Sequence, residues 1–184
     1  MSSCIPLNIS ADDGKIQGLD GDDVQEQTLK LISQEDEKFE IPKRIAIQSE
    51  LVKTMSEGDK EENEIPLPNV KSATLRQVIE YLTYHVDNPA KEIEKPLKSI
   101  HMREVVCEWD AKFVEIEQEP LFELILAANY MDIKPLLELC CAKVSSMIKG
   151  KTPEQIRKTF NIVNDFTPEE ETRIIAENKW VEEA

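Results

Sequence analysis

The densest apolar stretch of the chain spans residues 119–150 and reads EPLFELILAANYMDIKPLLELCCAKVSSMIKG, in a sequence that is otherwise rich in charge. Apolar residues recur there at helical spacing on both sides of a short link at residues 132–134. Pro120 and Pro135 suit the first position of a helix, and Gly150 suits the position after a helix end. Because two apolar helices with so short a link must pack side by side, the stretch predicts a helical hairpin at the centre of the core.

The side chains expected to face that core follow the same spacing. On the first helix they are Leu121, Phe122, Ile125, Leu126 and Ala128, and on the second helix they are Leu136, Leu137, Cys140, Val144, Met147 and Ile148. We interpret Cys140 as a core thiol rather than a nucleophile, because free cysteine is commonly buried.

Composition and charge narrow the function classes. A chain of 184 residues can bury one core with a small appendage. Its formal net charge of −15 argues against a surface that binds nucleic acid or anionic membrane, since both need clustered lysine and arginine. We expect no membrane-spanning segment and no signal peptide, so the four cysteines should be reduced thiols of the cytosol or nucleus.

The part of the chain before the hairpin predicts a small sheet with helices. Residues 1–26 are acidic and contain three of the five glycines, and we expect a mobile tail there. Alternating apolar side chains predict a β-hairpin at residues 28–41 around a polar turn at residues 34–37. A helix should follow at residues 43–55, and the two prolines of residues 65–68 favour an edge strand.

Helical spacing also indicates which side chains of the other helices lie inside. From residues 43–55, those expected to face inward are Ile45, Leu51, Val52 and Met55. Ser72 is the expected N-cap of a further helix, whose inward residues are Leu75, Val78, Ile79 and Leu82. After a connector without clear periodicity at residues 87–108, Trp109 and Phe113 predict a short helix beneath the hairpin.

The residue types of catalytic and metal sites are sparse. His85 and His101 lie in separate segments, neither at the i, i+4 spacing of a metal-ligand pair, and no CxxC occurs. Cys107 with His101 could form a nucleophile and a base, but no third residue nearby in the sequence would orient the histidine. No glycine-rich strand-to-helix turn could hold a phosphate. We therefore expect a protein without enzymatic activity, metal or cofactor.

The C-terminal part of the chain predicts a surface for a partner. Thr152-Pro153-Glu154-Gln155 and Thr167-Pro168-Glu169-Glu170 are capping boxes that predict helices at residues 153–160 and 168–179, and neither helix is long enough to be stable alone in water. These helices and their link carry eight large apolar residues, which are Ile156, Phe160, Ile162, Val163, Phe166, Ile174, Ile175 and Trp180. Short helices attached at one edge cannot bury all of them, so part of this surface should bind another protein.

Two long segments, LILAANYMDIKPLL and MIKGKTPEQIRKTFNIVNDFTPEEE, resemble the signature of the S-phase kinase-associated protein 1 family. The resemblance is close at residues 65–86 and from residue 109 to the C-terminus, and it does not cover the residues before about 28. Members of the family are small adaptors of SCF-type ubiquitin ligases. The resemblance implies an α+β fold of the BTB/POZ type, in which a small three-stranded sheet packs on helices and a helical C-terminal extension follows.

The resemblance also implies two binding surfaces. The family interlocks with the F-box, a three-helix motif of substrate receptors, and the F-box-facing candidates at matching positions are Val144, Pro153, Ile156, Phe160, Ile162, Phe166 and Trp180. The matching Asn-Tyr pair of the family contacts a cullin, which implies that Asn129 and Tyr130 bind a cullin here. Without the resemblance, Asn129 would be a helix-end residue and Tyr130 a half-buried tyrosine with a solvated hydroxyl.

Together these features predict a non-catalytic adaptor of the cytoplasm and nucleus. It would bridge a cullin, and indirectly the RING subunit of that cullin, to F-box proteins for ubiquitin-dependent degradation, without contact to nucleic acid or membrane. The expected parts are a tail at residues 1–26, a BTB/POZ domain at residues 27–149 and an F-box-binding extension at residues 150–184. The alternatives are an elongin C-like adaptor, which would lack the extension, and a self-associating BTB regulator. Weak self-association through the receptor-binding face is compatible with the adaptor role.

Overall fold

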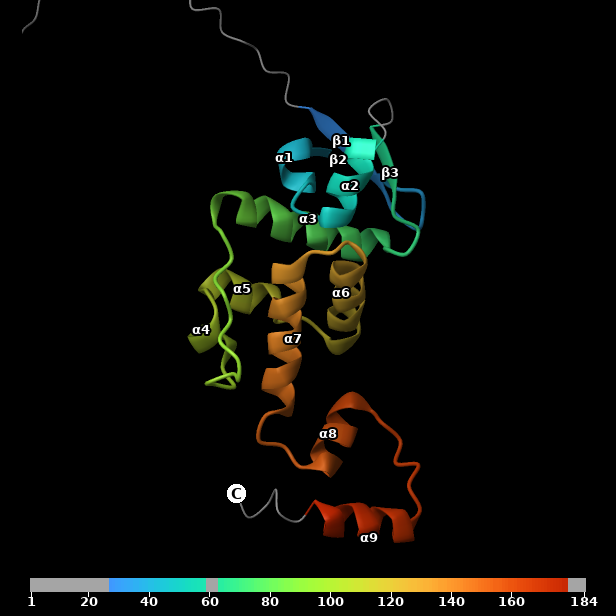
Figure 1. Cartoon of the computed structure of the whole chain (residues 1–184), viewed down its shortest axis with the longest axis vertical. Helices are drawn as coiled ribbons and strands as arrows, with labels where there is room; N and C mark the ends of the chain where they lie inside the picture. The colour runs from blue at the N-terminus through green and yellow to red at the C-terminus, as the bar shows by residue number, and fades with distance from the viewer. Residues whose placement is uncertain (1–26, 59–62, 179–184) are drawn as a thin grey trace, which may run out of the picture.

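The computed structural model describes residues 27–58 and 63–178 (Figure 1). A small sheet lies at one end of the molecule, one long helix crosses beneath it, and the predicted helical hairpin follows on the other side of that helix (Figure 1). Two short helices end the described chain far from the sheet (Figure 1). The predicted tail at residues 1–26 and Trp180 lie outside the described residues.

The sheet consists, in the described part of the chain, of β1 (Thr28–Ile32), β2 (Lys38–Pro42) and β3 (Glu64–Pro66), in the order β2-β1-β3. β1 and β2 form the predicted antiparallel hairpin, with Leu29 opposite Ile41 and Leu31 opposite Phe39. β3 pairs with β1 in parallel and lies at the edge. The edge position confirms the prediction from its prolines, because Pro66 has no N–H to offer to a further strand.

The single helix predicted at residues 43–55 is wrong, because the chain forms α1 (Lys43–Ala46) and α2 (Glu50–Gly58) with a turn between them. Ser49 lies buried at this break. Its hydroxyl donates to the carbonyl of Met131 at 2.5 Å and accepts the N–H of Val52 at 3.2 Å. The break changes the side of α2 that meets the core, so that Met55, which was expected inside, is exposed.

The predicted N-cap of the next helix, α3 (Ser72–Asp87), is also wrong. Ser72 is the first residue of the helix, and Lys71 occupies the cap position without a side-chain hydrogen bond. The carboxylate of Glu35, in the turn of the β-hairpin, accepts the N–H of Ser72 at 2.7 Å and its hydroxyl at 2.8 Å. The bond from the Ser72 N–H is the main cause that lowers the pKa of Glu35. A side chain distant in sequence therefore caps this helix.

The predicted helical hairpin is confirmed as α6 (Gln118–Tyr130) and α7 (Lys134–Ile148), and its buried side chains form one core with those of the sheet and α3. Asp132 adopts a positive φ of 49° in the link. Gly150 adopts a φ of 75° just after α7, as expected for a residue that follows a helix end. Pro120 is the third residue of α6 rather than the first, because the helix begins two residues earlier.

The core-facing side of α6 was predicted only in part. Its buried residues are Leu121, Leu124, Ala127 and Ala128. Phe122 and Leu126, which were expected inside, are exposed, and Leu126 is 68% exposed. Both sides of this helix are apolar, so that helical spacing alone cannot show which side meets the core.

The inward side of α7 was predicted better at its start than at its end. Leu136 and Cys140 are buried, while Val144 and Met147 are half-buried and Ile148 is exposed. The two helices run antiparallel, and the last turns of α7 extend past the beginning of α6 (Figure 1), so they have less core to pack against.

Two short helices precede the hairpin, α4 (Met102–Val105) and α5 (Glu108–Phe113). Trp109 of α5 stacks on Tyr84 of α3, with ring centroids 3.9 Å apart and planes 2° apart. Phe113 lies 5.6 Å from Tyr81 of the same helix. The predicted short helix is present. Its two rings stack on each other at 5.0 Å and contact α3, a neighbour that the sequence did not predict.

The extension consists of α8 (Pro153–Phe160) and α9 (Pro168–Glu177). Both capping boxes are confirmed. The hydroxyls of Thr152 and Thr167 each accept the N–H of the third helical residue at 3.3 Å, and the side chains of Gln155 and Glu170 accept in return at 3.0 and 2.9 Å. No residue of α8 or α9 is buried.

Replacement of Ser49 by alanine should lower the free energy of unfolding by about 1–3 kcal/mol, because the buried Met131 carbonyl would lose its 2.5 Å bond and be left with the longer bond from the Leu51 N–H at 3.4 Å. Urea unfolding followed by circular dichroism measures the change. Thr54→Ala is the matched control, since the Thr54 hydroxyl donates to the Glu50 carbonyl on the exposed side of α2. The control should shift the free energy by less than about 0.5 kcal/mol. Equal effects of the two substitutions would contradict the role of Ser49.

Candidate functional site

The C-terminal apolar surface, as we define it, comprises the described residues that were predicted to face an F-box, which are Val144, Pro153, Ile156, Phe160, Ile162 and Phe166. Ile162 is 54% exposed and Phe166 is 46% exposed, while Ile156, Phe160 and Val144 are half-buried. Apolar area of this kind gains about 25 cal/mol per Å² when another surface covers it. Within residues 150–178 the extension leaves apolar side chains of this surface in contact with solvent, as the shortness of its helices predicted.

Two contacts attach α8 to the start of α6. The side-chain amide of Gln118 donates to the carbonyl of Thr159 at 3.1 Å. The ring of Phe160 lies 6.1 Å from the ring of Phe122, with the planes tilted by 48°. Phe122 was expected in the core, but it supports the extension from the outer side of α6. Phe160 is held on one side by this contact and leaves its other side to solvent.

Arg157 joins the two short helices of the extension. Its guanidinium donates to the carboxylate of Glu171 in α9 at 3.2 Å and lies 5.7 Å above the ring of Phe166. The side-chain amide of Asn164 donates to the same carboxylate at 3.1 Å. These contacts fix the position of Phe166 in the link between α8 and α9 while its ring stays partly exposed.

Three further exposed apolar residues lie near this surface. Val163 and Ile175 were among the eight apolar residues that the sequence placed in the extension but not among its F-box candidates, and Ile148 was expected in the core. Val163 is 82% exposed, Ile175 is 59% exposed, and Ile148 is exposed at the end of α7. Ile148 belongs to what we call the α7 stripe, an apolar row at helical spacing formed by Leu137, Cys141, Val144 and Ile148. Cys141 and Ile148 are exposed, while Leu137 and Val144 are half-buried and pack against the core as expected, so the stripe lies along the edge between the inner and outer sides of α7.

The capping boxes place negative charge at the starts of α8 and α9. The bond from the Thr167 N–H lowers the pKa of Glu170, and the bond from the Thr152 hydroxyl lowers the pKa of Glu154. Both carboxylates are therefore ionised at neutral pH. The hydrogen bonds that these carboxylates accept contribute their full stability at pH values above the ordinary glutamate pKa. That contribution is lost as the pH falls through the lowered pKa of the folded state.

The second predicted surface lies on the outer side of α6, and we call it the Asn-Tyr surface. Asn129 is exposed and Tyr130 is half-buried in the last turn of the helix, as expected for these residue types. Asp132 donates its N–H to the Asn129 carbonyl at 3.2 Å, which fixes the start of the link. Leu126 lies one turn earlier on the same side, and we include it in this surface. The sequence missed it because its spacing fitted the core equally well.

A hollow of about 220 Å³ adjoins Leu126. An ion pair between Lys71 and Glu123 lines it, and Glu123 also accepts the hydroxyl of Thr74 at 3.2 Å. The hydrogen bond between Lys71 and Glu123 lowers the pKa of the glutamate and raises the pKa of the lysine, so both groups are charged at neutral pH. The Asn-Tyr surface thus combines an exposed leucine with fixed polar groups, which is typical of a protein interface.

His85 is buried and has a partner on each ring nitrogen. Nε2 lies 2.9 Å from the carboxylate of Asp110, and Nδ1 lies 2.6 Å from the carbonyl of Asn88. The sulfur of Cys107 accepts the N–H of Asp110 at 3.4 Å and caps α5. The cluster ties α3, the following connector and α5 together. The nucleophile and base considered from the sequence were Cys107 and His101. His101 is exposed just before α4, and within the described residues no hydrogen bond joins it to Cys107.

Neither metal ligation nor a membrane span is supported within the described residues. No group of three histidine, cysteine, aspartate or glutamate side chains in residues 27–58 and 63–178 could hold a metal ion. No helix of this part of the chain is long and apolar enough to cross a membrane.

Burial raises the pKa of the Cys140 thiol to about 12, so this residue is the neutral core thiol that the sequence predicted.

A three-stranded sheet packed on helices, with a helical extension after a central hairpin, defines an α+β protein of the BTB/POZ class. Residues 27–87 match the tetramerisation domain of the Skp1 family, and residues 134–181 match the dimerisation domain of the same family. The chain belongs to the Skp1 family.

Curated relatives cover most of the chain. The S-phase kinase-associated protein 1 homolog of Tetrahymena thermophila is 54% identical over 157 residues, which are 85% of this chain and 95% of the relative. The SKP1-like protein 1A of Arabidopsis thaliana is 49% identical and covers 83% of this chain and 95% of its own length. The E3 ubiquitin ligase complex SCF subunit sconC of Arthroderma benhamiae is 48% identical, with 84% and 95% covered.

N-ethylmaleimide at about pH 8 should modify Cys141 and spare Cys140. The thiolate is the reactive form, and a pKa of about 12 leaves far less of it on Cys140 than on an exposed cysteine. Burial adds a steric barrier, so we expect labelling at least about a hundredfold slower. Peptide mass spectrometry of the Cys141→Ser variant, folded and in urea, follows Cys140 separately from Cys4 and Cys107. Equal labelling rates in the two conditions would place Cys140 outside the core.

Proposed function

We propose that this chain is the adaptor subunit of an SCF-type E3 ubiquitin ligase and that it binds F-box proteins on the C-terminal apolar surface. The observation that carries the proposal is the extension itself, in which α8 and α9 have no buried residue and leave large apolar side chains in contact with solvent. Such a surface usually marks a protein interface. A relative named as an SCF subunit supports the same role.

The shape of the extension suits a helical partner. Phe160 ends α8 and Phe166 lies in the link to α9, and the side chains of both are partly exposed to solvent. Partly exposed aromatic side chains are common anchors of protein interfaces. Because Arg157 joins α8 to α9 and to Phe166, the exposed apolar side chains of both helices and their link are held together as one surface. The proposed contact residues for the F-box are Val144, Pro153, Ile156, Phe160, Ile162, Phe166 and Trp180.

We further propose that the Asn-Tyr surface binds the cullin. Leu126 would supply the apolar centre of that interface, and Asn129 and Tyr130 would supply its hydrogen bonds. This surface belongs to α6, whereas the proposed F-box contacts belong to α7 and the extension, so both partners can bind together. The adaptor would then act without catalysis, by positioning the receptor on the scaffold and raising the effective concentration of substrate.

The rest of the predicted organisation belongs to this proposal. Residues 27–149 would form the BTB/POZ domain and residues 150–184 the F-box-binding extension, in a protein of the cytoplasm and nucleus. The extension disfavours an elongin C-like adaptor, which shares the core and lacks this part. A self-associating BTB regulator would sediment as a stable dimer on its own, whereas an adaptor would at most associate weakly through the receptor-binding face.

Phe160→Ala and Trp180→Ala should each weaken the affinity for a purified F-box protein by at least about tenfold, because each substitution removes an aromatic anchor. Isothermal titration calorimetry measures the affinity, and circular dichroism checks that the BTB/POZ core stays folded. Lys158→Ala, at an exposed position of α8, is the matched control and should bind like the unmodified chain. Unchanged affinity in both aromatic variants would remove this surface from the F-box assignment.

The double substitution Asn129→Ala with Tyr130→Ala should abolish capture of a purified cullin and leave F-box binding within about twofold, because the two surfaces lie on different helices. A pull-down with each partner separately measures both effects. Lys134→Ala, at an exposed position in the first turn of α7, serves as the control and should keep both partners. Loss of the F-box with retention of the cullin would exchange the two surfaces.

A further inference from the structure

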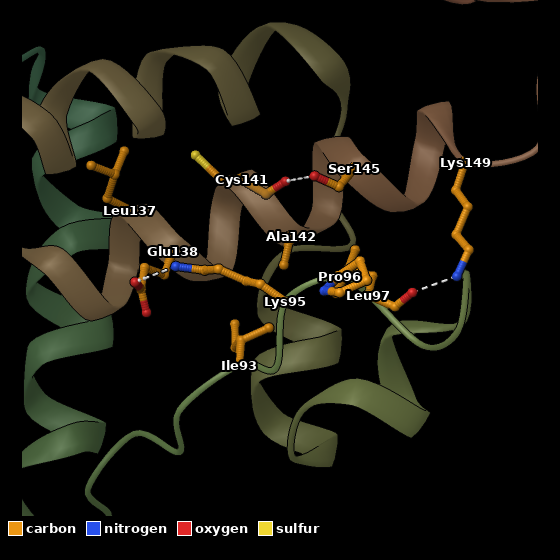
Figure 2. Close-up of a pocket in the computed structure, with 10 residues that line it drawn as sticks. All are labelled: Ile93, Lys95, Pro96, Leu97, Leu137, Glu138, Cys141, Ala142, Ser145 and Lys149. Carbon is orange, nitrogen blue, oxygen red and sulfur yellow. Dashed lines mark hydrogen bonds and ion pairs between the residues drawn. The ribbon is translucent and has the colours of Figure 1, made fainter. Parts of the chain in front are cut away.

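A groove of about 750 Å³ lies between α7 and the connector that follows α3 (Figure 2). Leu137, Cys141 and Ser145 of α7 form one side, and Ile93 and Leu97 of the connector form the other. The groove is mostly apolar, and its volume is within the roughly 300–1,000 Å³ of sites that hold a ligand or a short segment of a partner. It lies outside the residues proposed above for the F-box and the cullin.

Polar contacts at two points hold the connector beside α7. The ammonium of Lys95 lies 2.7 Å from the carboxylate of Glu138 (Figure 2). The ammonium of Lys149 donates to the carbonyls of Leu97 and Lys98, the second at 3.2 Å. Ile93 is buried and Leu97 packs against the core, so apolar contacts anchor the same segment. The wall of the groove is therefore fixed by the fold.

The α7 stripe connects this groove with the C-terminal apolar surface. Leu137 and Cys141 line the groove, and Val144 and Ile148 continue the row toward the extension. Successive members of the row are three or four residues apart, so they lie on one side of the helix. A partner that covers Val144 and Ile148 and continues along α7 would enter the groove over an unbroken apolar strip.

Of the two lysines that line the groove, Lys95 forms an ion pair with a carboxylate and Lys149 does not within the described residues. Glu138 neutralises Lys95. Lys149 lies at the end of α7 nearest the extension, and its bonds in the described part of the chain are to carbonyl oxygens, without a carboxylate at ion-pair distance. An apolar channel with an unbalanced cation at one end is complementary to a segment that carries apolar side chains and an acidic one.

We propose that the groove binds a segment of the F-box protein that adjoins the F-box in sequence, with apolar side chains against Leu137 and Leu97 and a carboxylate on Lys149. This inference rests on the proposed function, because it requires a receptor on Val144 and Ile148. The connector wall would contact residues that differ among receptors that share the F-box. The groove would then help to determine which receptors bind most tightly.

The test uses the full chain and one F-box protein that binds it, prepared as the three-helix F-box alone and as the F-box with its native flanking residues. Ser145→Trp fills the groove from an exposed position of α7. Lys149→Gln removes the charge and keeps a donor for the Leu97 carbonyl. Lys98→Gln is the matched control, since it removes a connector charge that pairs with Glu94 outside the groove.

Ser145→Trp should weaken binding of the flanked form by at least about tenfold, and Lys149→Gln by about threefold to fivefold, with the loss at Lys149 shrinking at high salt. The F-box alone should bind all variants within about twofold, and Lys98→Gln should match the unmodified chain. Calorimetry measures the affinities, and thermal unfolding confirms that the variants are folded.

Three results would overturn the proposal. An equal loss for both forms would mean that the F-box itself fills the groove. Full affinity of both forms for Ser145→Trp would mean that the groove stays empty, while the proposed function would stand. A change in the sedimentation of the free Ser145→Trp chain, with binding unaffected, would identify a second copy of the chain as the occupant. Failure of the unmodified chain to bind either form would instead contradict the proposed function.

Discussion

The packing of α6 against α7 is the constraint on which the other parts of the structure depend. Leu121 and Leu124 of one helix and Leu136 and Cys140 of the other are almost fully buried in the shared core. The sheet, α2 and α3 pack around this pair of helices. A buried hydrogen bond from the Ser49 hydroxyl, just before α2, to the Met131 carbonyl joins α2 to the link between α6 and α7. Since the two inner faces are used by the core, apolar side chains on the outer faces are left for other proteins.

Both proposed interfaces follow from this division. The outer side of α6 presents Leu126 beside the Asn-Tyr pair, and α7 presents a stripe, half-buried at Leu137 and Val144 and exposed at Cys141 and Ile148, that leads into the extension. Two partners on one rigid hairpin are held at a fixed separation, which is what an adaptor requires. The extension differs from the hairpin, because α8 and α9 are joined to the body by limited contacts such as that of Phe160 with Phe122.

Predictions from local patterns succeeded where the determining contacts are themselves local. The capping boxes at Thr152 and Thr167 form within four residues, and the exposure of Ile162 and Phe166 followed from helices too short to cover them. Predictions failed where a distant group decides. The break at Ser49 depends on a carbonyl 82 residues away, and the cap of α3 depends on a carboxylate 37 residues away. Leu126 was misplaced because both sides of its helix are apolar.

The sequence by itself determined that a helical hairpin forms the core, that a small sheet precedes it, and that the C-terminal helices carry more apolar surface than they can bury. These properties depend on periodicity, capping and helix length, which short segments of the chain already contain. Only the tertiary structure decided which side of each hairpin helix faces out and that the connector forms a groove along α7. Those outcomes depend on which distant groups pair with one another, because a helix with two apolar sides can pack either side until its neighbours are in place.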